Sequence, residues 1–358
     1  MAYRIAATGL DRATAAAPSA LPVLDLGVQD TPYGTARLAL AARTTGPLDD
    51  PALALVWAAR GAPHLHRRSE VAAVARALWP LSDADATARI MNPRIREGAG
   101  LGLAAYSAAA EAMREVVTGP MPKGEVSREV SARIPETLTF DCGPCGSRHI
   151  AGSLFQLVGA AAGVEVVPRG RATELAPLPG RAAVPDAASG TDDLIRTYLR
   201  FLGPATPAEA AGYVDATRAH LSPAWPETGL AEVRVAGRSA WLPEDRVDAL
   251  LTAPEPGHVR LLGVRDPLLQ ARDRDLLVPE RTNQKRLWTA LGAPGAVLAH
   301  GEITGTWRAK SSGTTLAITA TPFTRFPAEV AAALTDEAQV VAAARGAATA
   351  RVEITDPA

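Results

Sequence analysis

The stretches TDDLIRTYLRFLGPATPAEAAGYVDATRAHL (191–221) and VRVAGRSAWL (233–242) decide the fold. Thr191 and Thr206 are typical N-cap residues, and a segment with helical apolar spacing follows each, so two helices are predicted. The second stretch alternates apolar and polar residues around Gly237, which predicts a two-stranded hairpin. Two helices followed by a β wing are the element order of a winged helix-turn-helix unit.

A similar unit is expected near the N-terminus. Residues 34–44 have the apolar spacing of an amphipathic helix. An acidic pair before Pro51 is a typical helix start, so we expect a second helix over ALALVWAAR (52–60). The following GAPHLHRR (61–68) is expected to be extended and to form the wing.

A further unit is expected over residues 119–189. Its elements alternate between helix and strand, with helices over 123–135 and 149–163 and strands over 137–140 and 164–168. Residues 169–190 are rich in glycine, proline and alanine, and we interpret them as a linker or a long wing.

The C-terminal part of the chain is β-rich. Alternating segments at 259–264, 296–309 and 314–323 predict strands, and a helix over 328–345 and a strand over 350–354 follow. The sequence therefore predicts an α+β protein of about three tandem winged helix-turn-helix domains with a C-terminal β-rich module. The expected segments are 1–118 with the first winged helix, 119–189 with the second and a linker, 190–253 with the third, and 254–358 with the β-rich module.

Composition excludes several classes of protein. Of the 358 residues, 47% are hydrophobic and 21% charged, as in packed globular proteins and unlike disordered or collagen-like chains. No apolar run reaches the ~18 residues that a membrane-spanning helix needs. Asp11 and Arg12 interrupt the segment that a signal peptide would keep apolar. We therefore expect a cytoplasmic protein. The two cysteines are too few for a disulfide framework, which agrees with a reducing compartment.

Basic residues are concentrated in two runs that contain no acid, 60–68 and 89–96. Because the net charge is −1, attraction to a nucleic acid would have to come from such local patches. The first run is either a solvated basic face or an arginine-bearing wing that contacts phosphates. Arg89 begins the second run, and the candidate DNA-contacting residues of the two runs are Arg60, His64, His66, Arg67, Arg68, Arg94 and Arg96.

The two cysteines form the motif CGPC (142–145). A strand-like run precedes it and a helical pattern follows, which is the setting of a thioredoxin-type redox motif. The neighbouring chain lacks the alternating strands and helices of that fold. A zinc site would add His149 as third ligand, whereas structural zinc sites use four ligands. We interpret the motif as a structural turn into a helix, and we expect no metal or cofactor.

The segment LGVQDTP (26–32) places Gln29 and Asp30 just before the helix predicted at 34–44. Its ordinary interpretation is a loop in which Asp30 or Thr31 caps that helix.

Several spaced motifs lie along the chain. They are Arg60-Gly61-x-x-His64-Leu65, Tyr198-Leu199-Arg200-x-x-Gly203-Pro204-Ala205-Thr206, Leu261-Leu262-Gly263-x-x-Asp266-Pro267-Leu268-Leu269 with Asp273-Arg274, and Gly301-x-x-x-Gly305-Thr306-Trp307. Together with the array of winged helices, these motifs resemble the AlkZ-like (YcaQ-like) DNA glycosylase family. The resemblance extends from about residue 20 to residue 325.

The resemblance implies where catalytic residues would lie. The family's signature is glutamine–apolar–glutamine or glutamine–apolar–aspartate ahead of a helix. On this chain Gln29 takes the second catalytic position, Val28 the apolar one, and Gly27 stands where the family has its first glutamine. A frame shifted by one residue would instead put Asp30 on the second position. Gln29 and Asp30 are therefore the catalytic candidates, and duplex DNA is the implied partner.

The chemistry of such a site follows from its substrate. Hydrolysis of a purine N-glycosidic bond passes through an oxocarbenium-like sugar. A purine alkylated at N7 is already cationic and leaves without protonation, so the enzyme must mainly position water and stabilise the sugar cation. The carbonyl of Gln29 can accept a hydrogen bond from that water. No lysine lies near Gln29 in the sequence, which disfavours a Schiff-base lyase step.

The leading interpretation is a monomeric, monofunctional glycosylase that removes N7-alkylated purines, as bulky adducts or interstrand crosslinks, from duplex DNA. The alternative is a winged-helix DNA-binding protein without activity, a regulator or lesion binder, because Gly27 replaces the first signature glutamine. A redox protein using Cys142 and Cys145 is the third interpretation.

Overall fold

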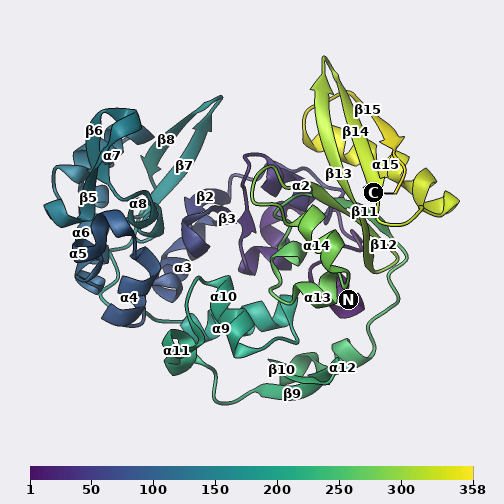
Figure 1. Ribbon diagram of the computed structural model, residues 1–358, viewed down its shortest axis with the longest axis horizontal. Coiled ribbons are helices and arrows are strands. Elements are labelled where there is room, and N and C mark those ends of the chain that lie inside the picture. Colours follow the sequence, from purple (N-terminus) through teal and green to yellow (C-terminus); the bar gives the residue numbers. More distant parts are fainter. Residues whose placement is uncertain (358) are drawn as a thin grey trace. The chain divides into compact units, whose positions relative to one another are not determined.

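The computed structural model describes residues 1–357, which form two compact units (Figure 1). The first unit contains Met1–Asp50, Leu199–Ala205 and the chain from Gly229 onward, and the second contains Pro51–Tyr198 and Thr206–Thr228. Both units contain helices and strands, so the expected α+β class is confirmed. The unit boundary after Asp50 falls inside the segment expected at 1–118. No helix within residues 1–357 combines the length and the apolar character needed to cross a bilayer.

A sheet organises the second unit. The strands that this unit contributes to it lie in the order β3-β2-β7-β8-β4, with bounds Pro63–Arg67, Leu53–Trp57, Val164–Arg169, Ala172–Pro177 and Met121–Pro122. The helix expected over 52–60 is wrong, because β2 lies inside this sheet and pairs antiparallel with both β3 and β7. All five residues of β2 are buried. A continuous apolar run of this length suits a strand that is covered on both faces, and periodicity alone does not separate it from a buried helix.

Strands β7 and β8 form a hairpin, and they lie side by side in Figure 1. The strand expected at 164–168 is confirmed, and part of the segment 169–190, expected to be a linker or a long wing, forms the returning strand β8. The core of this unit includes the edge-to-face pair Trp79 and Tyr106. Six helices contribute buried residues to it, namely α3 (Val71–Leu78), α4 (Asp83–Ile90), α5 (Arg96–Ala99), α6 (Leu103–Val116), α7 (Lys123–Ser131) and α8 (Gly152–Leu157). The unit also contains α10 (Pro207–Tyr213) and α11 (Arg218–Leu221).

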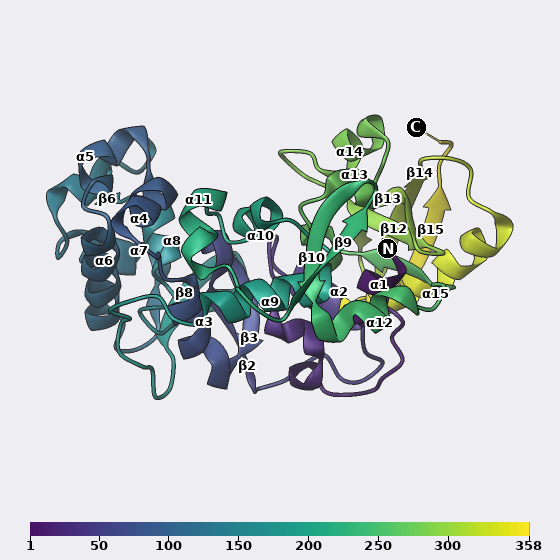
Figure 2. The same ribbon diagram turned by 90° about the horizontal axis from the view of Figure 1, so that it is seen from below.

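The helices and the hairpin predicted over 191–242 are present, but Thr191 is the first residue of its helix and not the N-cap, and the second predicted helix is divided into α10 and α11. Helix α9 (Thr191–Leu202) begins at Thr191. Thr206 caps α10 and forms a capping box with Glu209. The predicted hairpin is β9 (Leu230–Val235) and β10 (Arg238–Pro243), which Figure 2 shows side by side.

The first unit is built on the C-terminal sheet β11-β12-β13-β14-β15, which confirms the expected β-rich module. Helix α15 connects the parallel strands β14 and β15, and it buries Val330, Leu334, Ala338 and Val341 on one face against the sheet core. This spacing is that of an amphipathic helix. The bounds are Val259–Leu262, Gly295–Ala299, Glu302–Ser312, Thr315–Pro322 and Thr349–Ile354 for β11 to β15, and Ala328–Ala344 for α15.

Two buried ion pairs fasten the N-terminal segment to the C-terminal part of the first unit. Arg43 follows α2 (Thr35–Ala41) and pairs with Asp266, and Arg4 of α1 (Ala2–Ala7) pairs with Asp273. Both arginines use two nitrogens on the two carboxylate oxygens, at 2.6–2.8 Å. Strand β1 (Val28–Gln29) also belongs to the first unit.

Candidate active site

Gln29 is the last residue of β1 and is 7% exposed. Its side-chain Oε1 accepts a hydrogen bond of 3.2 Å from Nε2 of Gln270. Gln270 ends the short 3-10 helix Pro267–Gln270, which follows the Asp266 that pairs with Arg43. The orientation of the Gln29 amide is therefore set by a residue 241 positions away in the chain, which sequence reasoning missed.

Asp30 faces the start of helix α2. Its carboxylate accepts the backbone N–H of Ala36 at 2.9 Å. Burial raises the pKa of Asp30, while hydrogen bonds from backbone N–H groups of Ala36, Gly34 and Thr35 act in the opposite direction. The N-cap residue of α2 is Gly34 and not Asp30, but the Asp30 carboxylate accepts an N–H of the first turn from outside the helix, where the helix dipole favours a negative charge.

Gly27 adopts a left-handed backbone conformation with φ of 74°. Residues other than glycine rarely take this conformation. A glutamine at this position would require the backbone before β1 to change. Gly27 therefore differs from the signature glutamine in its backbone conformation as well as in its missing side chain.

The run 60–68 is not a free basic surface. His64 and His66 are buried in β3, at 1% and 3% exposure. Arg67 pairs with Glu70, and Arg68 makes two hydrogen bonds with Glu165 of β7. Arg60 also has a partner, because its guanidinium lies 5.1 Å from the centroid of the Tyr213 ring and donates to the backbone carbonyl of Tyr213. The run itself contains no acid, and the carboxylate that pairs with Arg68 comes from the distant strand β7.

Burial favours the uncharged forms of His64 and His66. Burial lowers the pKa of His64 well below its ordinary value, and Nδ1 of the ring lies 2.8 Å from the Ala62 carbonyl oxygen. Burial also lowers the pKa of His66 to about 4. A buried neutral ring offers a phosphate neither charge nor access, so we do not retain His64 and His66 among the proposed DNA contacts.

The state of His66 predicts a loss of stability in acid. The unfolded chain binds the proton near pH 6.5 and the folded chain near pH 4, so stability is lost as the pH falls through this window. We expect His66 to contribute about 3 kcal/mol to that loss. Urea unfolding at a series of pH values gives the unfolding free energy as a function of pH. Between pH 4 and 6.5 this free energy should depend less steeply on pH for His66→Gln than for the wild type. The exposed His258→Gln is the control, and equal slopes for His66→Gln and the wild type would contradict the assignment.

In the second basic run, 89–96, one arginine is buried and two are exposed. Arg89 forms a buried ion pair with Asp85, at 4% and 0% exposure, so it is not a surface cation. Arg94 and Arg96 are exposed, and neither has an ion-pair partner among residues 1–357. The Arg94 guanidinium lies 4.8 Å from the centroid of the Phe140 ring. These two arginines are the available cations of the run.

The CGPC motif lies in a hairpin and not at the start of a helix, so that expectation is wrong. Strands β5 (Thr139–Cys142) and β6 (Ser147–Ile150) pair antiparallel, and the motif supplies the turn between them. Both cysteines are free thiols. A hydrogen bond from His149 lowers the pKa of Cys142.

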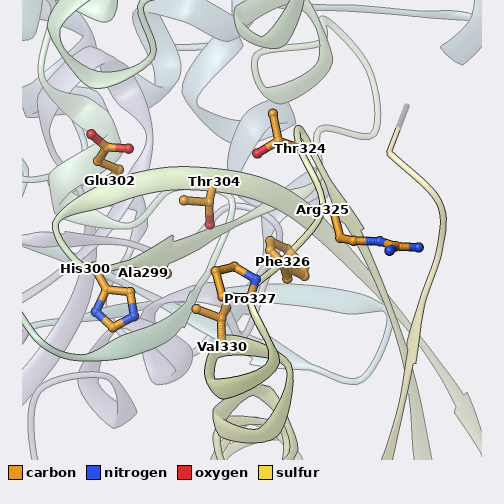
Figure 3. A pocket seen from close by; sticks show the side chains of 9 residues that line it. All are labelled: Ala299, His300, Glu302, Thr304, Thr324, Arg325, Phe326, Pro327 and Val330. Carbon is orange, nitrogen blue, oxygen red and sulfur yellow. The ribbon is translucent and has the colours of Figure 1, made fainter.

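An open pocket of about 240 Å³ lies in the first unit, between the β12–β13 turn and the segment before α15 (Figure 3). His300, Pro327 and Val330 lie together in Figure 3, whereas the guanidinium of Arg325 points away from the other labelled side chains. The lining residues do not include Gln29 or Asp30, so this pocket is separate from the candidate active site.

Comparisons with known proteins identify the family. A family model described as DNA glycosylase AlkZ-like matches residues 24–344. None of the curated proteins matches the chain. Among solved structures, the DNA glycosylase AlkZ of Streptomyces sahachiroi shares the fold, with a TM-score of 0.76 and 22% sequence identity over 99% of this chain and 98% of that chain. The chain therefore belongs to the AlkZ-like family of DNA glycosylases.

Proposed function

We propose that this protein hydrolyses the N-glycosidic bond of N7-alkylated purines in duplex DNA, including bulky adducts and interstrand crosslinks, and acts as a monomer without a lyase step. The observation that carries the proposal is the state of Gln29. Its neutral amide is held by Gln270, while the neighbouring carboxylate of Asp30 is directed into α2. In the proposed mechanism the site acts through this carbonyl acceptor and without a general base.

A carbonyl acceptor suits a leaving base that is already cationic. Such a base departs without an acid, so the remaining tasks are to orient one water and to favour the developing sugar cation. The Gln29 Oε1 atom is the acceptor for both tasks, and its bond from Gln270 fixes its direction. Neutral bases need protonation to leave, so this site should act on them poorly.

The substrate class can be tested with a panel of duplexes. We expect release of free base from duplexes that contain N7-methylguanine or an N7-linked crosslink, and no measurable release of hypoxanthine. Strands should break only after alkali treatment, since hydrolysis leaves an intact abasic site. Strand cleavage without alkali, or equal release of hypoxanthine, would contradict the proposed reaction.

Asp30→Asn tests whether the carboxylate acts only on the start of α2 or as a base. If Asp30 only accepts N–H groups of α2, Asp30→Asn should change the unfolding free energy by less than about 1 kcal/mol, because an amide oxygen accepts the same bonds, and the rate of base release should stay within a few-fold. Thermal unfolding and single-turnover release of N7-methylguanine measure the two effects. A rate loss of about 100-fold or more with an unchanged fold would identify Asp30 as the group that activates water.

Contact with DNA is proposed to involve phosphates and the exposed cations Arg94 and Arg96. Replacing both by alanine should weaken binding to every duplex alike and flatten the dependence of log affinity on log salt by about two units. Arg67→Ala with Arg68→Ala is the comparison, and a smaller change is expected because both side chains are already paired with glutamates. Fluorescence anisotropy at several salt concentrations gives both slopes. An unchanged slope for the Arg94 and Arg96 variant would remove these residues from the proposed surface.

A second candidate function is DNA binding without catalysis, and Gly27 is the observation that favours it. The first signature glutamine is missing, and the left-handed backbone at this position does not readily accept one. A protein that binds alkylated duplexes but releases no base from any of them would have this function.

A further inference from the structure

The β5–β6 hairpin brings together three side chains that can bind a metal ion, Cys142, Cys145 and His149. Phe140 lies opposite His149, and Cys142 lies opposite Ser147. The turn closes through the N–H of Gly146, which donates to the Cys142 carbonyl at 2.9 Å and has φ of 59°. In this geometry the two sulfur atoms and a ring nitrogen of His149 all lie within 4.8 Å of one another.

The environment of His149 prepares one ring nitrogen to act as a ligand. Its Nδ1 atom lies 3.0 Å from the backbone carbonyl oxygen of Ile150. Since that oxygen can only accept, Nδ1 carries the proton and Nε2 keeps its lone pair. A backbone carbonyl that fixes the tautomer in this way is typical of metal-bound histidines. The ring also meets Phe140 edge-on, with centroids 4.8 Å apart, which restrains its orientation.

We propose that Cys142, Cys145 and His149 bind one Zn²⁺ ion. Two thiolates and one imidazole are ligands that zinc prefers, and both thiols are free. Among residues 1–357 the group contains no fourth histidine, cysteine or carboxylate, so water completes the tetrahedron. The motif and His149 belong to the second unit, whereas Gln29 belongs to the first, and the ion is assigned to this hairpin alone.

The proposed ion would brace a weak part of the fold. Two-stranded hairpins are marginally stable by themselves, and the turn residues here are exposed. Binding that requires the folded hairpin adds its free energy to the stability of that hairpin. The ion would also fix His149, and through it the Phe140 ring on which Arg94 lies.

Metal titration of the full chain tests the proposal. Protein that has been reduced and freed of metal by chelation should bind one Zn²⁺ per chain in competition with a chromophoric chelator. Co²⁺ should give the visible bands of a tetrahedral site and a thiolate-to-metal charge-transfer band. Both signals should vanish in the variant with Cys142→Ser and Cys145→Ser. His149→Gln should weaken Zn²⁺ binding at least about tenfold, and His258→Gln should leave it unchanged.

Several results would overturn the proposal. One is Zn²⁺ binding that survives the loss of both cysteines, and another is His149→Gln binding zinc as tightly as the wild type. A chain that binds no zinc while its two thiols cycle reversibly to a disulfide in glutathione buffers would be a redox protein instead. Near-UV circular dichroism checks the fold of each variant. The His149→Gln variant keeps both thiols, so it tests the site even if the serine variant unfolds.

Discussion

Gln29→Ala is expected to lower the rate of N7-methylguanine release by about 100- to 1,000-fold, the usual effect of removing one positioned polar group from a hydrolytic site. The affinity for duplex DNA should change by less than a factor of about three, because phosphate contacts dominate binding. The substitution removes the Oε1 atom that orients water and leaves the backbone of β1 in place. Single-turnover release and fluorescence anisotropy measure the two quantities separately.

Gln270→Ala is the companion variant, because Gln270 acts through Gln29. As a positioning residue it should lower kcat less than Gln29→Ala does and leave KM nearly unchanged. If Gln29→Ala keeps the full rate, Gln29 is not catalytic. If Gln270→Ala raises KM alone, its role is in binding and not in orienting Gln29.

Asp266→Ala is expected to cost the first unit about 3–5 kcal/mol of unfolding free energy, since it leaves a buried guanidinium without its partner. Arg43 and Asp266 are 1% and 0% exposed and make two hydrogen bonds with each other. Asp266 also accepts the N–H of Leu268 at 3.0 Å. Urea unfolding of the full chain should show the first unit unfolding at lower denaturant concentration.

A double replacement separates charge from packing. Arg43→Met with Asp266→Leu removes both charges together and should recover part of the stability that Asp266→Ala loses. A loss below about 1 kcal/mol for Asp266→Ala would show that the pair contributes little. Such a result would also weaken the account of how Gln270 is placed, because Gln270 ends the short helix that begins after Asp266.

The local part of the fold could be predicted from the sequence. Thr206 and Glu209 stand three residues apart and form the capping box, and the alternation around Gly237 gives the β9–β10 hairpin. The alternating segments after His258 give the C-terminal sheet. In each case the residues that determine the structure are neighbours in the chain, so their spacing carries the information.

The errors arose where distant residues decide the structure. LALVW forms strand β2 because β3 pairs with it on one edge and the distant β7 pairs with it on the other. The sequence of the run 60–68 contains no acid, but Arg68 is paired with Glu165, 97 residues away, and Arg67 with Glu70, just outside the run. The same limit hid Gln270 beside Gln29, and it hid the hairpin that brings His149 to the two cysteines.

The most direct test of the central claim is a single-turnover reaction of the purified wild type with a duplex that contains one N7-methylguanine. Free N7-methylguanine is measured by mass spectrometry, and abasic sites are measured by alkali cleavage of the labelled strand. We expect both to rise together in equal amounts, far above spontaneous depurination, and Gln29→Ala to reduce both to near the spontaneous rate. A wild type that binds this duplex and releases no base above the spontaneous rate would contradict this expectation.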